Sequence, residues 1–146
     1  MEKKKILQRL KQSGQRLTSV RSGLLDLFLQ PHTPLAAQEI LTLLKKTHSE
    51  LNKTTIYRQL GLLTTAGILE VVDFQEGQKR YELAQGESHH HHLVCTVCKS
   101  VEHISLHSLE KILTRLEQDF HTKKKFQVET HALEFFGRCA SCQSLL

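Results

Sequence analysis

The sequence predicts an α+β protein in two domains, a helical N-terminal domain that ends in a β-hairpin and a smaller C-terminal domain of mixed α/β structure. Three observations predict this class. Apolar residues recur with a helical period through the first 65 residues, two β-like runs follow, and two Cys-x-x-Cys pairs lie in the second half of the chain. A chain of 146 residues can bury one modest core or two small ones.

Four helices are expected before the hairpin. They cover about residues 3–12, 19–29, 36–46 and 53–65. Thr18 or Ser19 can cap the second helix, because their hydroxyls accept hydrogen bonds from the first turn. Pro31 and Pro34 then force a turn.

The fourth helix is expected to bury one face. Its Ile56, Leu60 and Leu63 recur at i, i+4 and i+7 and should face the core. The residues left outside are Thr54, Thr55, Tyr57, Arg58 and Gln59. Such a face suits a DNA groove, since Arg can bond guanine or phosphate, Gln can read adenine, and hydroxyls reach phosphates. An ordinary polar helix face is the alternative.

The hairpin and the charge of the chain favour the DNA-binding interpretation. Residues 68–74 and 79–83 flank the turn Gln75-Glu76-Gly77-Gln78 and are expected to pair. Helices followed by a hairpin make a winged helix-turn-helix domain, here residues 1–83. Residues 1–60 carry 11 Lys and Arg against 4 Asp and Glu, whereas residues 61–146 carry 9 against 11. This uneven distribution of charge suggests a polyanion partner for the basic half, although a charged run alone is more often a solvated face.

A hinge and a second domain follow. Residues 84–88 are polar and small, and the domain after them covers residues 89–146. Strands are expected over 89–94, 100–105 and 126–136, a helix over 106–121, and a solvated loop over 123–125. The helix carries an apolar stripe that can pack on a sheet or pair two chains, formed by Leu106, Leu109, Leu113, Leu116 and Phe120.

The four cysteines form the pairs Cys95/Cys98 and Cys139/Cys142. Four thiolates are the full ligand set of a tetrahedral structural zinc, which leaves no position open for catalysis. Disulfides or buried thiols are the alternative. The chain shows neither a signal peptide nor a long apolar stretch, so we expect a soluble protein in a reducing cytoplasm, without a membrane partner. Loss of the zinc should then unravel the C-terminal domain.

Four consecutive histidines precede the first cysteine pair. In an extended strand, His90 and His92 share one side while His89 and His91 share the other. One run can therefore serve two metal sites, and neutral imidazole suits Zn, Fe, Ni and Cu. A tag or a functionless solvated run is the alternative. Further candidate ligands are Glu82, His103, Glu110 and His131.

Several of these segments together resemble the ferric uptake regulator (Fur) family of metal-dependent transcriptional repressors, which includes Zur and PerR. The similar segments are KTTIYRQLGLLTTAGIL, the hairpin ending RYEL, HHHHLVCTVC and GRCASC. The resemblance implies that the C-terminal domain dimerises. It also implies DNA contacts by Arg16, near the minor groove, and by Thr55, Tyr57 and Arg58 of the fourth helix.

The same resemblance implies three metal sites. The structural zinc would be held by Cys95, Cys98, Cys139 and Cys142. A sensing site would use Glu82, His90, His92 and His103, with His32 as a further candidate. A second regulatory site would use His89, His91, Glu110 and His131.

Three positions depart from the family pattern. Pro34 stands where the family usually has a histidine, which leaves His32 as its candidate replacement. His91 stands where an Asp is frequent, and His103 where a carboxylate is common. Shells richer in nitrogen fit zinc or nickel at least as well as ferrous iron. We therefore expect Fe²⁺ or Zn²⁺ as the regulatory ion, with Mn²⁺ and Ni²⁺ as further candidates. The extra cysteine that is frequent in zinc-tuned members is missing.

The function implied is that of a repressor of iron or zinc uptake genes. It would bind a palindromic operator in double-stranded DNA as a metal-loaded homodimer, with no enzymatic activity and no small-molecule substrate beyond metal ions. A peroxide-sensing repressor of the same family and a metal-storage or chaperone protein are the alternatives. A zinc hydrolase is disfavoured, because the chain has no H-E-x-x-H pattern.

Overall fold

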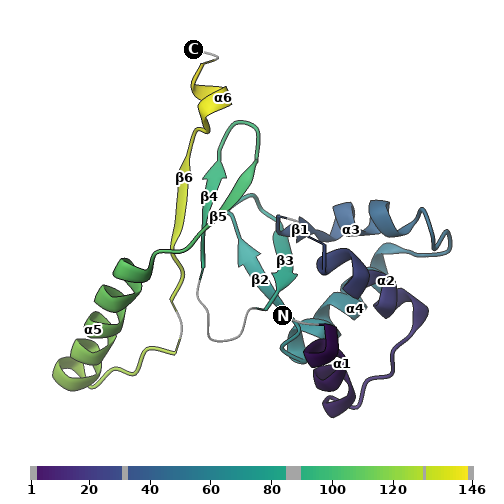
Figure 1. Cartoon of the computed structure of the whole chain (residues 1–146), viewed down its shortest axis with the longest axis horizontal. Coiled ribbons are helices and arrows are strands. Elements are labelled where there is room, and N and C mark those ends of the chain that lie inside the picture. The colour runs from purple at the N-terminus through teal and green to yellow at the C-terminus, as the bar shows by residue number, and fades with distance from the viewer. Residues whose placement is uncertain (1–2, 31–32, 85–89, 130, 145–146) are drawn as a thin grey trace. The chain divides into compact units, whose positions relative to one another are not determined.

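The computed structural model describes the chain except for residues 1–2, 31–32, 85–89, 130 and 145–146. The chain divides into two compact units, Met1–Gly86 and Glu87–Leu146. Both mix helices with a three-stranded sheet (Figure 1). Most of the predicted hinge, from residue 85 to residue 88, lies outside the described residues. No helix in the described part of the chain is long and apolar enough to cross a membrane.

The N-terminal unit contains the four predicted helices. Its elements are α1 (Lys3–Gln12), α2 (Ser19–Phe28), β1 (Leu35–Ala36), α3 (Ala37–Leu44), α4 (Lys53–Thr65), β2 (Leu69–Asp73) and β3 (Lys79–Leu83). Thr18 is the cap of α2, as its hydroxyl accepts the Arg21 N–H at 3.3 Å. Asn52 caps α4 in the same way and accepts the Thr55 N–H at 2.8 Å. Both helices therefore begin where a side-chain oxygen satisfies a first-turn N–H group.

The predicted hairpin is confirmed, and a short strand is added to it. Strands β2 and β3 pair antiparallel with Val71 opposite Tyr81. The unpredicted strand β1 lies on the other side of β3, so the sheet order is β1-β3-β2. Arg80 fixes this edge, because its buried guanidinium donates to the Pro34 carbonyl at 3.0 Å. Helix α3 starts after β1 and is shorter than expected.

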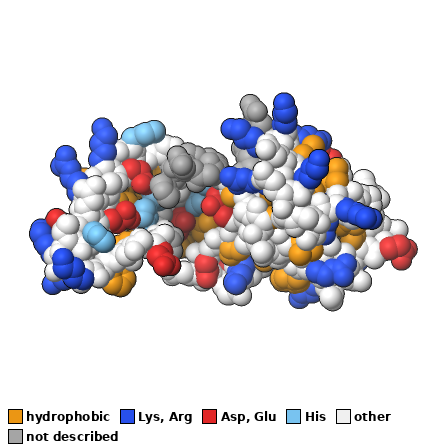
Figure 2. All heavy atoms as spheres, turned by 90° about the horizontal axis from the view of Figure 1, so that it is seen from below, with side chains coloured by type: hydrophobic (Ala, Val, Ile, Leu, Met, Phe, Trp, Pro, Cys, Tyr) orange, Lys and Arg blue, Asp and Glu red, His pale blue; other side chains and the backbone are white. Residues whose placement is uncertain are grey.

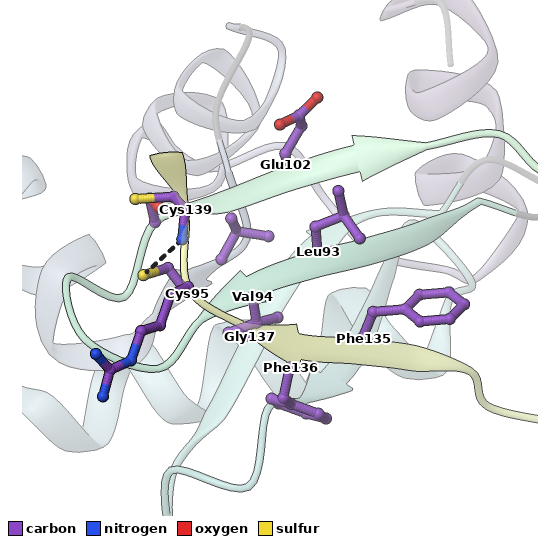
Figure 3. A pocket seen from close by; sticks show the side chains of 11 residues that line it. Leu93, Val94, Cys95, Glu102, Phe135, Phe136, Gly137 and Cys139 are labelled. Atoms are coloured by element: carbon purple, nitrogen blue, oxygen red, sulfur yellow. Dashed lines mark hydrogen bonds between the residues drawn. The ribbon is translucent and has the colours of Figure 1, made fainter. Parts of the chain in front are cut away.

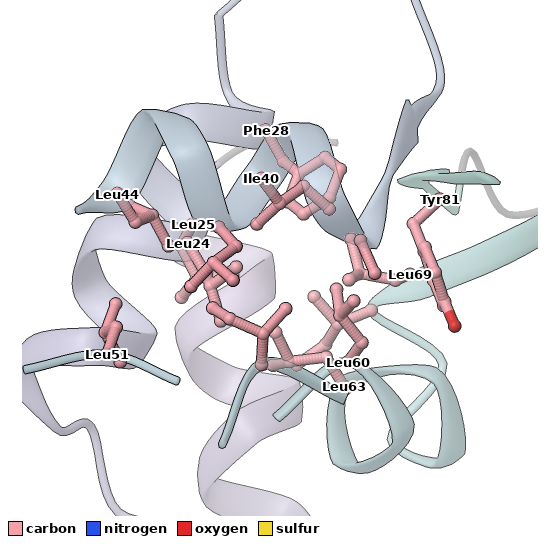
Figure 4. Packing of buried hydrophobic residues seen from close by; sticks show 14 of the residues in the cluster. Leu24, Leu25, Phe28, Ile40, Leu44, Leu51, Leu60, Leu63, Leu69 and Tyr81 are labelled. Atoms are coloured by element: carbon pink, nitrogen blue, oxygen red, sulfur yellow. The ribbon is translucent and has the colours of Figure 1, made fainter. Parts of the chain in front are cut away.

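The core of the N-terminal unit lies between the helices and the sheet (Figure 4). Ile56, Leu60 and Leu63 of α4 are fully buried, as their spacing predicts. The prediction that Gln59 lies outside is wrong. Gln59 is 6% exposed, and its Oε1 accepts a 2.7 Å hydrogen bond from Nε of the buried Arg21. A charged partner from α2 thus holds this amide inside the unit.

The C-terminal unit is a sheet with one long helix. Its elements are β4 (His91–Cys95), β5 (Val101–Ile104), α5 (His107–Lys124), β6 (Glu134–Gly137) and α6 (Ala140–Gln143). The sheet order is β5-β4-β6, with β4 antiparallel to β5 and parallel to β6. The expected strand over 126–136 is largely wrong, because only its end pairs with β4. The expected loop over 123–125 is also wrong, since α5 continues to Lys124 and ends at Lys125 in the left-handed region.

Helix α5 differs from the other long helices because none of its residues is buried. Its apolar stripe includes Leu116 and Phe120, which are 44% and 43% exposed. The sheet also leaves apolar side chains open, among them Leu93 and Phe135. The described residues of the C-terminal unit therefore leave apolar surface exposed.

Candidate metal centres and nucleic-acid-binding helix

The four cysteines come together at the end of the C-terminal sheet. Parallel pairing of β4 with β6 places Cys95 opposite Gly137, so the segment after β6 brings Cys139 and Cys142 beside the first pair. The four sulfur atoms lie within 4.8 Å of one another, and the Cys98 and Cys139 Sγ atoms are 3.7 Å apart. All four are free thiols. Four sulfurs that converge without bonding to one another fit a tetrahedral zinc ion.

Hydrogen bonds lower the pKa of two of these thiols, which favours the thiolate form that binds a cation. The Cys139 N–H donates to Cys95 Sγ at 3.4 Å, and this bond is the main cause that lowers the pKa of Cys95 to about 5 (Figure 3). The Ser100 side chain, with Oγ 3.2 Å from Cys98 Sγ, is the main cause that lowers the pKa of Cys98. The pKa of Cys142 is instead raised to about 12, first by its hydrogen bond with Cys139 and then by burial. Zinc binding would remove the proton of Cys142, because coordinated thiols are deprotonated.

Three histidines form a second cluster on one face of the C-terminal sheet. His92 lies opposite His103 across the β4–β5 pair, and His90 precedes His92 by two residues. The ring centroids of His90, His92 and His103 are each 4.9 Å from the other two. His92 is 1% exposed. Imidazoles gathered at this spacing offer a nitrogen-rich set of ligands to a transition metal.

Glu134 contacts this histidine cluster and was not predicted from the sequence. It lies opposite His92 across the β4–β6 pair. Its Oε2 atom is 3.0 Å from His92 Nδ1 and accepts the His92 backbone N–H, also at 3.0 Å. Two further members were predicted for the sensing site. Glu82 lies in β3 of the N-terminal unit, where it is buried, and His32 is outside the described residues.

The residues predicted for the second regulatory site are only partly brought together. His91 Nε2 lies 2.6 Å from Oε1 of Glu110 in α5, and its Nδ1 lies 3.1 Å from the Leu133 carbonyl. The His131 ring stacks 6.4 Å from the His91 ring. However, His131 Nδ1 lies 2.9 Å from Glu117, which the sequence did not single out. His89 is outside the described residues.

The exposed face of α4 keeps three of its predicted contact residues accessible. Tyr57 is 47% exposed, Arg58 is exposed, and Thr55 is partly exposed. Lys53 Nζ lies 5.8 Å from the centre of the Tyr57 ring. Arg16 is exposed on the segment before α2, and its carbonyl accepts a hydrogen bond from Arg21 Nη1. Figure 2 shows Lys and Arg side chains over much of the visible surface of the N-terminal unit, on the right of the view.

Comparison with known proteins places the chain in a family. The model of the ferric uptake regulator family matches residues 12–136. This chain belongs to the ferric uptake regulator family. It is 33% identical over 141 residues to the ferric uptake regulation protein of Bacillus subtilis, an alignment that covers 94% of this chain and 92% of that one.

Solved structures of Fur proteins share the fold. The Helicobacter pylori ferric uptake regulator, described with three functional metal-binding sites, superposes with a TM-score of 0.80 at 22% identity, over 98% of this chain and 95% of that one. The Vibrio cholerae regulator, described with rearranged DNA-binding domains, gives a TM-score of 0.74 at 30% identity, over 90% and 98%. The predicted α+β fold is thereby confirmed. This chain, with its four-cysteine cluster, is a member of a family of transcription regulators.

Proposed function

We propose that this protein is a metal-responsive repressor that binds operator DNA as a homodimer when its sensing site is loaded. The observation that carries this proposal is the cluster of His90, His92 and His103, whose rings are gathered by the pairing of two strands. A preorganised set of nitrogen ligands binds metal without the cost of ordering the chain. Family membership supports regulation, rather than metal storage or hydrolysis, as the use of this cluster.

The cysteine cluster has a separate task in this proposal. A zinc ion held by Cys95, Cys98, Cys139 and Cys142 would tie the end of the chain to β4 and leave no coordination position open. Its role is therefore structural. The lowered pKa of Cys95 and Cys98 supports it, because zinc binds thiolates in preference to thiols.

The sensing site would be completed by Glu82 of the N-terminal unit, as the family resemblance implies. Three imidazoles and one carboxylate suit Zn²⁺ or Ni²⁺ at least as well as Fe²⁺. Metal held by ligands from both units would favour the arrangement of the dimer that fits successive half-sites of a palindrome. Loss of the metal would release the DNA. The genes controlled would be those for uptake of iron or zinc.

Dimerisation is supported by the uncovered apolar surface of the C-terminal unit. A hollow of about 460 Å³ opens on the sheet, with Leu93, Phe135 and Phe136 along it and Cys95 and Cys139 at one end (Figure 3). Helix α5 adds an apolar stripe with no buried residue. A second copy of the chain would cover both, since exposed apolar patches of this kind mark interfaces.

DNA binding is assigned to α4 and the segment around Arg16. Tyr57 and Arg58 are exposed, while Ile56, Leu60 and Leu63 hold the helix in the core. Arg58 would contact base edges or phosphate, and Thr55 and Tyr57 would contact phosphates.

The test is selection of DNA from a random pool, followed by fluorescence anisotropy with the selected duplex. The zinc-filled protein is first stripped of loosely bound metal, and Zn²⁺, Fe²⁺ under anaerobic conditions, Mn²⁺ or Ni²⁺ is added in turn. We expect one of these ions to switch on binding, and both His92→Ala and Arg58→Ala to abolish it while zinc in the cysteine cluster is retained. Binding that is equally tight with and without every metal would contradict the proposal.

A further inference from the structure

One carboxylate contacts the histidine cluster without belonging to any predicted ligand set. Glu134 begins β6, and its side chain reaches His92 at two positions. Oε2 accepts the His92 backbone N–H at 3.0 Å. The same oxygen lies 3.0 Å, and Oε1 3.2 Å, from the ring nitrogen Nδ1 of His92. The pair is secluded from solvent, with side-chain exposures of 17% for Glu134 and 2% for His92.

The sheet fixes this contact. His92 is opposite Glu134 in the parallel β4–β6 pair and opposite His103 in the antiparallel β4–β5 pair. Residues directly opposite one another in a sheet point to the same face. His103, His92 and Glu134 therefore form a row across three strands, with His92 in the middle. Backbone pairing therefore places Glu134 beside the central histidine of this row.

The chemistry of the contact determines which nitrogen of His92 can bind metal. An ionised carboxylate only accepts hydrogen bonds, so the nitrogen facing it, Nδ1, carries the proton. In the neutral ring the lone pair is then on Nε2. A carboxylate that binds the far nitrogen of a metal-ligating histidine fixes its tautomer and orientation and makes the ring a stronger donor.

We propose that Glu134 is a positioning residue of the sensing site, which directs Nε2 of His92 to the metal and strengthens the bond that this nitrogen forms. This inference rests on the proposed function, because it concerns the same histidine cluster. The Glu134 carboxylate also adds negative charge near a site that is otherwise rich in neutral imidazole. The ion it favours is a divalent cation with a preference for nitrogen ligands, such as Zn²⁺.

The experiment measures Zn²⁺ binding to the full chain by competition with a chromophoric chelator, without DNA and with the cysteine cluster already filled. Glu134→Ala removes both the charge and the acceptor, and we expect a loss of affinity of about 10- to 100-fold. Glu134→Gln keeps an oxygen acceptor without the charge, so its Zn²⁺ affinity should lie between those of Glu134→Ala and the wild type. The matched control is Glu102→Gln. Glu102 lies on β5 opposite Leu93, on the other face of the sheet. The Zn²⁺ affinity of Glu102→Gln should therefore equal that of the wild type.

A second readout separates positioning from a general structural effect. In ¹⁵N NMR of the zinc-loaded wild type, His92 should show a protonated Nδ1 and a metal-bound Nε2. Glu134→Ala should lose this fixed pattern while zinc in the cysteine cluster, measured by elemental analysis, stays at the wild-type content.

Three results would overturn the inference. They are an unchanged Zn²⁺ affinity in Glu134→Ala, metal on Nδ1 of wild-type His92, and, if Glu134→Ala does not fold, an unchanged affinity in Glu134→Gln. A wild-type protein that binds no metal beyond the cysteine cluster would instead overturn the sensing site itself, and the role of Glu134 with it. The wild-type titration therefore distinguishes failure of the inference from failure of the proposed function.

Discussion

At the scale of single residues, a buried arginine connects three segments of the N-terminal unit. In the N-terminal unit Arg21 is 7% exposed, and its guanidinium is held by Gln59 of α4 and by the carbonyl of Arg16. The helix proposed to enter DNA and the segment proposed to approach the minor groove are thus bonded to one side chain. A buried charge of this kind is stable only while its hydrogen bonds are made.

Gln59→Ala tests this arrangement. The substitution leaves a buried Arg21 donor without its acceptor, and we expect a loss of about 1–3 kcal/mol in the free energy of unfolding. Gln38→Ala, an exposed glutamine of α3, is the matched control and should change stability by less than about 0.5 kcal/mol. Urea denaturation followed by circular dichroism measures both. Equal effects in the two variants would show that the buried bond contributes nothing specific.

Ser100 should set the acid limit of zinc retention. Protons compete with zinc for thiolates, so zinc is held at neutral pH and lost as the pH falls toward the thiol pKa values. Ser100 lowers the pKa of Cys98, so this thiol resists protonation to lower pH. Ser100→Ala raises that pKa again, and the midpoint of zinc release should move to higher pH, as followed with a zinc-sensitive dye. Ser105→Ala, just beyond β5, should not move it. A midpoint that is the same in all three proteins would be inconsistent with this account.

At the scale of elements, helix α5 stands out because its apolar stripe is exposed. Leu109, Leu113, Leu116 and Phe120, with Leu106 just before the helix, repeat at helical spacing, yet no residue of the helix is buried. Phe120→Glu places a charge in the stripe and should turn a dimer of twice the 16.8 kDa chain mass into a monomer. Gln118→Glu adds a charge to the opposite side of α5 and should remain dimeric. Sedimentation velocity measures the mass, and a dimeric Phe120→Glu protein would exclude the stripe from the interface.

Local patterns predicted most of the elements and the burial of α4. Helix caps at Thr18 and the i, i+4, i+7 spacing of Ile56, Leu60 and Leu63 act within one segment, so they are visible in the sequence. The prediction for Gln59 was wrong because a residue distant in the sequence determines its burial. Gln59 is buried because α2 supplies Arg21.

The candidate metal sites were likewise predictable where a local pattern defines them. Strand alternation separates His90 and His92 from His91, and paired spacing identifies the cysteines. Glu134 was missed because its role depends on the register of β6 with β4, two strands about 40 residues apart in the chain. Glu117 was missed for a similar reason, since the loop before β6 brings His131 to α5. No local pattern carries such information.

At the scale of the whole molecule, the central claim is a coupling between metal and DNA. The histidine cluster lies in one unit and the exposed face of α4 in the other, so regulation requires that metal binding change the preferred arrangement of the proposed dimer. Coupling of this kind is reciprocal. Whatever factor the metal gives to DNA affinity, operator DNA must give to metal affinity, typically about 5- to 150-fold.

The measurement that tests this claim most directly is the affinity of the zinc-filled protein for its regulatory metal, determined with and without a saturating amount of the selected operator duplex. The account predicts that operator tightens metal binding by the same factor by which metal tightens operator binding, and that a scrambled duplex does not. His92→Ala should lose both effects together. A metal affinity that is the same with and without operator, in a protein that binds both, would contradict the account.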